Sequence, residues 1–346
     1  MLRLPGLIPP LLRFDAGADK PRAVLDTVQP RMATKSCKID GRAVTYGCVE
    51  GSGPTVLLIH GWGLSHHSYA AGAEALADQG FRVLSPDLPG FGDSKDLPYD
   101  RINFPGFAMT LHKFLSAVRR EGTPVGAPIE PVHIVGHSFG GAVAVQVAHD
   151  DPDLVRGLVL VDASSGSIWH RAGDDVRLVV DRPIWDWGLH LLSEFPLGDF
   201  PTTSMTVLRD LTHNVVWHPF SLGMVAHLIR HTDVHAELST IAKLGVPISV
   251  VWANGDRVVT RAEFDDQCTA AGCTGTEVDG NHGWLINDPA AFGRTLGEVL
   301  KSAGRRRTAT RSRTSVATRK AASASRSPKR TAAAATTSVG RQRITA

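Results

Sequence analysis

Short apolar runs alternate with amphipathic segments along most of the chain. Apolar runs of the length expected for strands buried on both faces occupy residues 55–60, 81–87, 132–135, 158–162 and 246–252. Segments with the apolar spacing of helices follow them, at residues 68–79, 104–120, 139–149, 261–271 and 288–302. Alternating strands and helices form a mostly parallel sheet with helices on both faces, so we predict an α/β fold of this kind.

Two further segments bring the predicted sheet to eight strands. Residues 36–49 have the pattern of an antiparallel hairpin at one edge, with Asp40-Gly41 as its two-residue turn. Residues 274–278 form a weak last strand.

The cysteines are predicted to be free thiols. In the hairpin register set by that turn, Cys37 faces Val44 and not Cys48, so no cross-strand disulfide forms. Cys268 and Cys273 lack a second cysteine pair at zinc spacing. Free thiols are typical of a reducing compartment, and we therefore predict a cytoplasmic location.

The alternation breaks between residues 164 and 240, which are rich in Trp, His and Phe and contain no clear buried strand. We predict that 164–240 form a helical cap above the carboxyl ends of the strands, where sites in such sheets lie. The α/β core then comprises residues 36–163 and 241–302.

The composition is that of a globular protein. Apolar residues make up 42% of the chain and charged residues 21%, and no apolar run is long enough to span a bilayer. Residues 1–35 contain an apolar stretch interrupted by three prolines, without a clear cleavage site. We predict a loosely ordered N-terminal arm there.

The charge is distributed unevenly. Residues 301–346 carry 13 Lys and Arg and no Asp or Glu, whereas the preceding residues carry 24 basic and 34 acidic side chains, a net charge of −10. The tail at 303–346 has almost no large apolar residues, so we predict disorder. It is suited to nucleic acid or an anionic membrane surface, but a solvated extension without a partner fits the composition equally. The acidic body argues against nucleic acid as substrate.

A serine stands between glycines where the apolar run 132–135 ends. Residues 136–140, G-H-S-F-G, fit the pattern G-x-S-x-G, in which the serine occupies a sharp, strained turn from strand to helix. Small neighbours are needed because larger side chains would collide with the turn. We predict that Ser138 is a nucleophile. The competing interpretation is a glycine-rich helix start that Ser138 merely caps.

A serine nucleophile needs a base, and we predict His282, in a loop between the last strand and the last helix. The imidazole needs a carboxylate that fixes its tautomer and stabilises its charged form. Asp256, in a tight turn after a buried strand, is the first candidate and Asp162 the alternative, while Asp87 is expected to anchor a loop. The order Ser138, Asp256, His282 is the order expected for this architecture.

The reaction also needs donors for a developing oxyanion. The backbone N–H of Phe139 is one candidate, because amides at a helix N-terminus are unpaired. The N–H of Trp62 is the other, in the loop H-G-W-G after the strand 55–60, where glycines allow close approach to a substrate.

With these motifs the chain resembles the α/β-hydrolase superfamily over roughly residues 36–302. The motifs are H-G-W-G, D-L-P-G-F-G-D-S, G-H-S-F-G-G, N-G-D and G-N-H-G. It is similar to the capped group of small-molecule esterases, serine-type haloperoxidases, carbon–carbon bond hydrolases and epoxide hydrolases. The resemblance implies that Ser138, Asp256 and His282 form the triad, with the two backbone donors named above. Epoxide hydrolases and haloalkane dehalogenases of this fold carry Asp at the nucleophile position, so Ser138 argues against both activities.

The predicted reaction is hydrolysis of a small apolar ester through an acyl-enzyme, without a cofactor. Carbon–carbon bond cleavage in a dienoic product, or a haloperoxidase-like reaction in which peroxide replaces water, are alternatives for the same triad. Aromatic residues of the predicted cap are expected to pack it onto the body and in part to line an apolar pocket. They are Trp169, Trp185, Trp187, Phe195, Phe200, Trp217 and Phe220.

Three histidines, His227, His231 and His235, recur at every fourth position. This spacing can place metal ligands on one helix face. No carboxylate motif accompanies them, so we interpret them as a polar helix face and predict no metal site.

Overall fold

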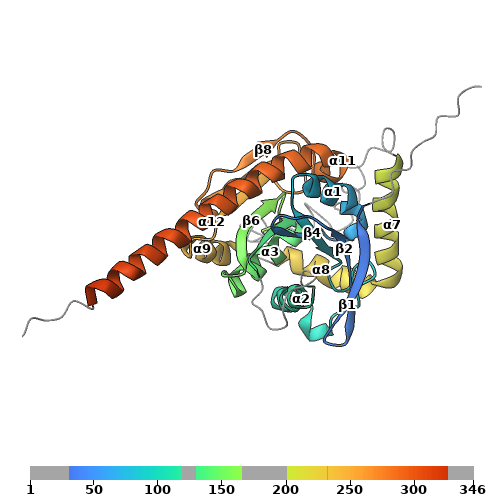
Figure 1. Cartoon of the computed structure of the whole chain (residues 1–346). Helices are drawn as coiled ribbons and strands as arrows, with labels where there is room; N and C mark the ends of the chain where they lie inside the picture. Colours follow the sequence, from blue (N-terminus) through green and yellow to red (C-terminus); the bar gives the residue numbers. More distant parts are fainter. Residues whose placement is uncertain (1–30, 119–129, 166–200, 232, 326–346) are drawn as a thin grey trace, which may run out of the picture. The chain divides into compact units, whose positions relative to one another are not determined.

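The sheet has eight strands in the order β1-β2-β4-β3-β5-β6-β7-β8. A computed structural model describes residues 31–118, 130–165, 201–231 and 233–325 (Figure 1). The strands are β1 (Ala33–Ile39), β2 (Arg42–Val49), β3 (Thr55–Ile59), β4 (Arg82–Pro86), β5 (Val132–His137), β6 (Val155–Val161), β7 (Ile248–Ala253) and β8 (Thr276–Val278). From β4 to β8 all neighbours are parallel, while β1 with β2 and β2 with β4 are antiparallel. The predicted, mostly parallel α/β sheet is confirmed, and it is open.

Helices connect the strands. They are η1 (His66–Tyr69), α1 (Ala70–Asp78), η2 (Tyr99–Arg101), α2 (Phe104–Ala117), α3 (Phe139–Asp150), α7 (Pro201–Trp217), α8 (Pro219–Arg230), α9 (His235–Lys243), α10 (Arg261–Ala271), α11 (Trp284–Asn287) and α12 (Pro289–Ser325). Polar caps begin several of them. The Asn103 side chain accepts from the Gly106 N–H before α2, and Asp288 accepts from the Ala291 N–H at the start of α12.

Successive residues of the central strands pack on opposite faces of the sheet. Leu57 and Ile59 of β3 join the core that also contains residues of α2, α3, α9 and α10. Val56 and Leu58 join the other core, with residues of α1, α11 and α12. Figure 1 shows α1, α11 and α12 together on one side of the sheet and α2 and α3 on the other. Burial on both faces explains why these strands are continuous apolar runs.

The hairpin has the predicted register, with Cys37 opposite Val44, and all four cysteines are free thiols. The predicted boundary of the N-terminal arm at residue 35 was wrong. Strand β1 begins at Ala33, which pairs with Cys48. An edge strand needs backbone pairing but no apolar face, so the polar residues before Ser36 gave no strand signal. The rest of the predicted arm, residues 1–30, lies outside the described residues.

We predicted disorder over residues 303–346, but helix α12 continues to Ser325, so the first part of this segment is helical. Residues 305–325 contain no Gly or Pro and are rich in Ala and Arg, which favour helix. The beginning of this extension also packs on the body. Ala303 is fully buried, and Arg307 donates to the carbonyl oxygen of Pro152 at 2.9 Å.

Helices α7, α8 and α9 lie between β6 and β7 in the chain, within the predicted cap. The Asp210 carboxylate of α7 accepts from the Ser65 N–H at 3.0 Å. Asn214 accepts from the Gly92 N–H and donates to the Gly63 oxygen, both at 2.8 Å. These partners belong to the loops that follow β3 and β4. Helix α7 therefore contacts the carboxyl edge of the sheet.

The aromatic residues predicted to pack the cap are only partly described. Phe220 is 56% exposed, but its ring contacts the Tyr99 ring of η2 at 5.7 Å between centroids, so it packs on the body as predicted. Trp217 is 69% exposed. Trp217 ends α7, and Phe220 is the second residue of α8. Trp169, Trp185, Trp187, Phe195 and Phe200 lie outside the described residues. In the part of the chain that is described, no helix is long and apolar enough to cross a membrane.

Candidate active site

Ser138 occupies the turn between β5 and α3, with φ 52° and ψ −124°. A positive φ at a residue with a side chain is strained by about 1–3 kcal/mol. The surrounding glycines leave room for this turn. A Cβ at Gly136 would collide with the carbonyl oxygen of Gly140, and a Cβ at Gly140 with that of Ile59. The turn thus places the serine hydroxyl just beyond the carboxyl end of a central strand.

His282 and Asp256 lie beside this serine. The His282 Nε2 atom is 3.1 Å from the Ser138 Oγ, and its Nδ1 is 2.7 Å from Asp256 Oδ2. The other oxygen, Asp256 Oδ1, accepts from the N–H groups of Val258 and Val259 at 2.7 and 2.9 Å. The carboxylate acts only as an acceptor here, so His282 Nδ1 carries a proton and Nε2 is free to accept one from the serine.

Asp162 has other partners. Its carboxyl group accepts from the Ala253 N–H and from the Trp284 indole N–H, both at 2.7 Å. Complete burial and the nearby charge of Asp256 raise the pKa of Asp162 well above its usual value. Because His282 Nδ1 is bound to Asp256, the geometry favours Asp256 over Asp162 as the partner of the imidazole.

The two predicted oxyanion donors lie on either side of Ser138. Phe139 is the first residue of α3, where N–H groups have no partner within the helix. Trp62 follows Gly61, at which a Cβ would lie 3.2 Å from the Ser138 Cβ. In the described parts of the chain, neither N–H donates to a protein acceptor. The Trp62 indole N–H donates to the Leu222 oxygen of α8 at 2.9 Å, which ties this loop to the segment between β6 and β7.

A buried hydrogen-bond network, which the sequence did not reveal, lies next to the three candidate catalytic residues. Tyr69 accepts from the Gly61 N–H at 2.9 Å, and its hydroxyl lies 2.6 Å from His137 Nδ1. His137 Nε2 is 3.0 Å from the carbonyl oxygen of His282. Since a carbonyl only accepts, Nε2 carries the proton and Nδ1 accepts from Tyr69. This hydrogen-bond network connects the loop that contains Trp62 to the loop that contains His282.

The two side chains of this network, Tyr69 and His137, are both neutral. Burial and the nearby His282 lower the pKa of His137 well below its usual value, and burial raises the pKa of Tyr69. The only sequence signal for the network is a histidine directly before the serine. Its partner Tyr69 belongs to a different element and could not be inferred from that position.

Asp87 anchors a loop, as predicted. One carboxylate oxygen accepts from both the backbone N–H and the Nδ1–H of His66, at 2.7 and 2.8 Å, and the other from the Asp93 N–H at 3.1 Å. Burial opposes the charge of Asp87, but the hydrogen bond and the charge of His66 outweigh it and lower the pKa of Asp87. His60 contributes from the neighbouring loop, where its Nε2 accepts from the Leu88 N–H at 2.8 Å.

The three evenly spaced histidines do not share one helix. His227 belongs to α8, His231 caps its end and His235 begins α9. His231 Nδ1 donates to the His227 oxygen, and His235 Nδ1 pairs with Asp233 at 2.7 Å. No group of three or more His, Cys, Asp or Glu with metal-binding geometry occurs within the described ranges.

Comparison with known proteins agrees with this architecture. The family model for the alpha/beta hydrolase fold matches residues 54–221. The magnesium-chelatase 30 kDa subunit of Rhodobacter capsulatus is 36% identical over 258 residues, which cover 70% of this chain and 84% of that protein. The chain belongs to the α/β-hydrolase superfamily.

Other relatives match shorter segments. An uncharacterized protein of Mycobacterium tuberculosis is 37% identical over 142 residues, which are 41% of this chain and only 38% of that protein. A soluble epoxide hydrolase of a Corynebacterium species is 31% identical over 201 residues, 56% of this chain and 64% of the relative. The bromoperoxidase structure from Bacillus anthracis has a TM-score of 0.62 at 23% identity, covering 78% of this chain and all of that one, and shares the fold.

Proposed function

We propose that the protein is a serine hydrolase that cleaves a small, apolar carboxylic ester through an acyl-enzyme. One observation carries the proposal. His282 lies between the Ser138 hydroxyl and the Asp256 carboxylate, at 3.1 and 2.7 Å, in the tautomer that accepts the serine proton. A hydroxyl at physiological pH becomes a nucleophile only beside such a base.

The reaction proceeds in two halves. Ser138 attacks the acyl carbon while His282 Nε2 takes its proton, and the backbone N–H groups of Trp62 and Phe139 stabilise the oxyanion. His282 then protonates the leaving alcohol. Water attacks the acyl-enzyme with the same imidazole as base, which releases the acid and restores the serine. The Asp256 carboxylate accepts from His282 Nδ1 and stabilises the imidazolium.

The substrate class rests on the segment between β6 and β7. We propose that it forms a cap over Ser138, because α7 contacts the loops after β3 and β4 and α8 contacts the loop after β3. Two alternative reactions use the same triad, carbon–carbon bond cleavage and a perhydrolase reaction with peroxide. The structural neighbours include an enol-lactonase from Burkholderia xenovorans and the bromoperoxidase named above, at 20% and 23% identity.

Hydrolysis of p-nitrophenyl esters of increasing acyl length tests this proposal. Wild type should turn over the short and medium esters faster than dienoic ketones and without added peroxide. Ser138→Ala should abolish turnover and keep the thermal unfolding midpoint. Ser52→Ala, in an exposed turn, is the matched control and should behave as wild type. Ester hydrolysis that survives in Ser138→Ala contradicts the proposal.

A second candidate function comes from one relative. The match to the magnesium-chelatase 30 kDa subunit extends over 84% of that protein at 36% identity. We propose as the alternative that this chain serves as a subunit in a magnesium-chelatase assembly. Addition of the purified chain to a chelatase lacking this subunit should then raise its activity. A rise that Ser138→Ala also produces favours the subunit role over hydrolysis.

A further inference from the structure

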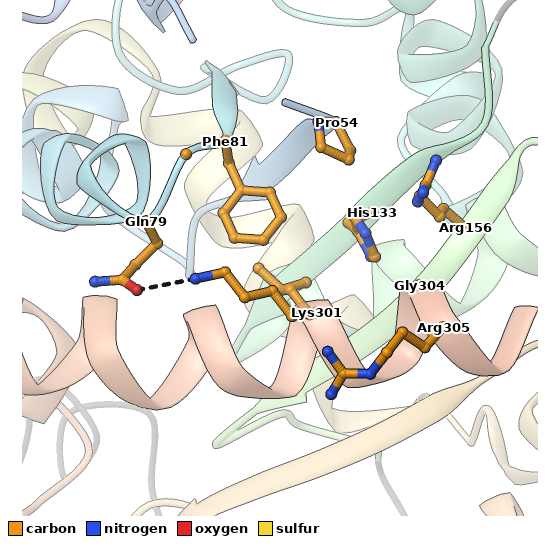
Figure 2. Close-up of a pocket in the computed structure, with 10 residues that line it drawn as sticks. Pro54, Gln79, Phe81, His133, Arg156, Lys301, Gly304 and Arg305 are labelled. Atoms are coloured by element: carbon orange, nitrogen blue, oxygen red, sulfur yellow. Dashed lines mark hydrogen bonds between the residues drawn. The ribbon is translucent and has the colours of Figure 1, made fainter. Parts of the chain in front are cut away.

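A cavity of about 580 Å³ lies at the opposite edge of the sheet from Ser138 (Figure 2). Pro54 and Phe81 directly precede β3 and β4, and His133 and Arg156 are the second residues of β5 and β6. All four therefore stand at the amino ends of parallel strands, whereas Ser138 follows the carboxyl end of β5. Ser138 lies five positions after His133 along the chain, about 17 Å at 3.3 Å per residue.

Helix α12 forms one wall of this open cavity, with residues that lie where the basic tail begins. Lys301, Gly304 and Arg305 face it, and Lys301 Nζ donates to the Gln79 oxygen at 3.3 Å. Gly304 allows the helix to approach closely, because a Cβ there would lie 3.3 Å from Arg156 Nε. Three cationic side chains from β6 and α12 therefore line the cavity (Figure 2).

The polar lining is basic and partly unpaired. Arg156, Lys301 and Arg305 line the cavity together with His133, and no Asp or Glu is among the lining residues. Within the described part of the chain, Arg156 Nε and His133 Nδ1 are buried without a hydrogen-bond partner, and His133 is only 1% exposed. Buried donors without an acceptor are destabilising, and an anion beside Arg156 would satisfy its N–H.

The remaining wall is apolar. Phe81 and Leu300 line it, and the Phe81 ring packs edge to face with His133 at 5.9 Å between centroids. Burial and the charge of Arg156 lower the pKa of His133 to about 4, so its ring is neutral and continues the apolar wall. A ligand that fits this lining has one anionic group and a small apolar body.

We propose that this cavity binds an amphipathic anion, with a carboxylate or phosphate group held by Arg156 and Arg305 and an aromatic or short alkyl body against Phe81. Guanidinium groups suit both anions because their planar N–H pairs match two oxygens. The site is separate from the triad and does not depend on the proposed hydrolysis.

Isothermal titration calorimetry of the full chain tests the proposal with four probes, namely phenyl phosphate, benzoate, inorganic phosphate and benzyl alcohol. We expect saturable binding of one equivalent of phenyl phosphate or benzoate, and the tighter of the two identifies the anionic group. Inorganic phosphate should bind at least tenfold more weakly, and benzyl alcohol should give no saturable heat.

Three variants locate the binding. Arg156→Gln and Arg305→Gln should each weaken the aromatic anion at least tenfold. Arg294→Gln, an exposed arginine earlier on α12, should leave it unchanged. Arg305 is exposed, so its variant remains informative even if Arg156→Gln fails to fold.

Three results would overturn the proposal. They are no saturable binding of either aromatic anion, binding that neither cavity variant weakens, and inorganic phosphate or benzyl alcohol that binds as tightly as the aromatic anions.

Discussion

Asp256→Asn tests how the carboxylate sets the tautomer of His282. Asp256 Oδ1 accepts from two backbone N–H groups, of Val258 and Val259. In the variant, the amide oxygen takes this place, because an NH2 group there would turn a donor toward both N–H groups. The NH2 group then faces His282 Nδ1, which must accept. The imidazole proton moves to Nε2, and Nε2 can no longer accept the proton of Ser138.

The structure also sets the size of this effect. Turning the amide to recover the productive tautomer replaces these two hydrogen bonds with donor–donor contacts, at about 1–3 kcal/mol each. The total of about 2–6 kcal/mol corresponds to a loss of roughly 30-fold to 10⁴-fold in rate. We expect kcat/KM for p-nitrophenyl butyrate to fall by about 10³-fold, while the thermal unfolding midpoint changes little.

Two further variants complete this experiment. Asp162→Asn should reduce stability, because its NH2 group faces the Ala253 or Trp284 donor, yet keep kcat/KM within about tenfold of wild type. Asp279→Asn, an exposed carboxylate that accepts from Asn254, should leave both quantities unchanged. The reasoning fails if Asp256→Asn stays within tenfold of wild type, or if Asp162→Asn loses 10³-fold with an unchanged unfolding midpoint.

Other predictions concern the support of the site. Tyr69→Phe leaves the buried Gly61 N–H and His137 Nδ1 without partners, so urea unfolding should show a loss of about 2–4 kcal/mol; no loss would contradict the hydrogen-bond network. The pKa of His137 is depressed in the folded state, so only the unfolded chain gains its proton as pH falls through about 6.5. The stability advantage of wild type over His137→Gln should therefore be largest above pH 7 and shrink toward pH 5, and a growing advantage would refute this. Gly140→Ala places a Cβ against the Ile59 carbonyl and should cost about 3 kcal/mol with loss of ester hydrolysis, checked by circular dichroism and turnover.

The site residues that directly follow apolar strand segments could be predicted from the sequence. Ser138 stands directly between an apolar run and a small-residue helix. The carboxyl ends of parallel strands share one edge, so loops after later strands could be expected to bring Asp256 and His282 to it. The structure places these three side chains within hydrogen-bonding distance.

Features that depend on tertiary contacts could not be predicted in this way. The Tyr69–His137 network requires the directions of side chains from η1 and β5, which no local pattern specifies. The end of α12 was missed because a segment rich in Ala, Arg and Ser has the composition of a disordered tail and the propensity of a helix at once. Contacts such as the one from Arg307 to Pro152 stabilise its first turns beyond residue 302, and they appear only in the folded chain.

Covalent labelling with an alkyl fluorophosphonate tests the central claim most directly. Peptide mass spectrometry should locate one adduct per chain on Ser138. The labelling rate should fall at least 10³-fold in His282→Gln and remain that of wild type in Ser52→Ala. A folded wild-type protein that gains no adduct at Ser138, or a His282→Gln variant that labels as fast as wild type, would contradict the account.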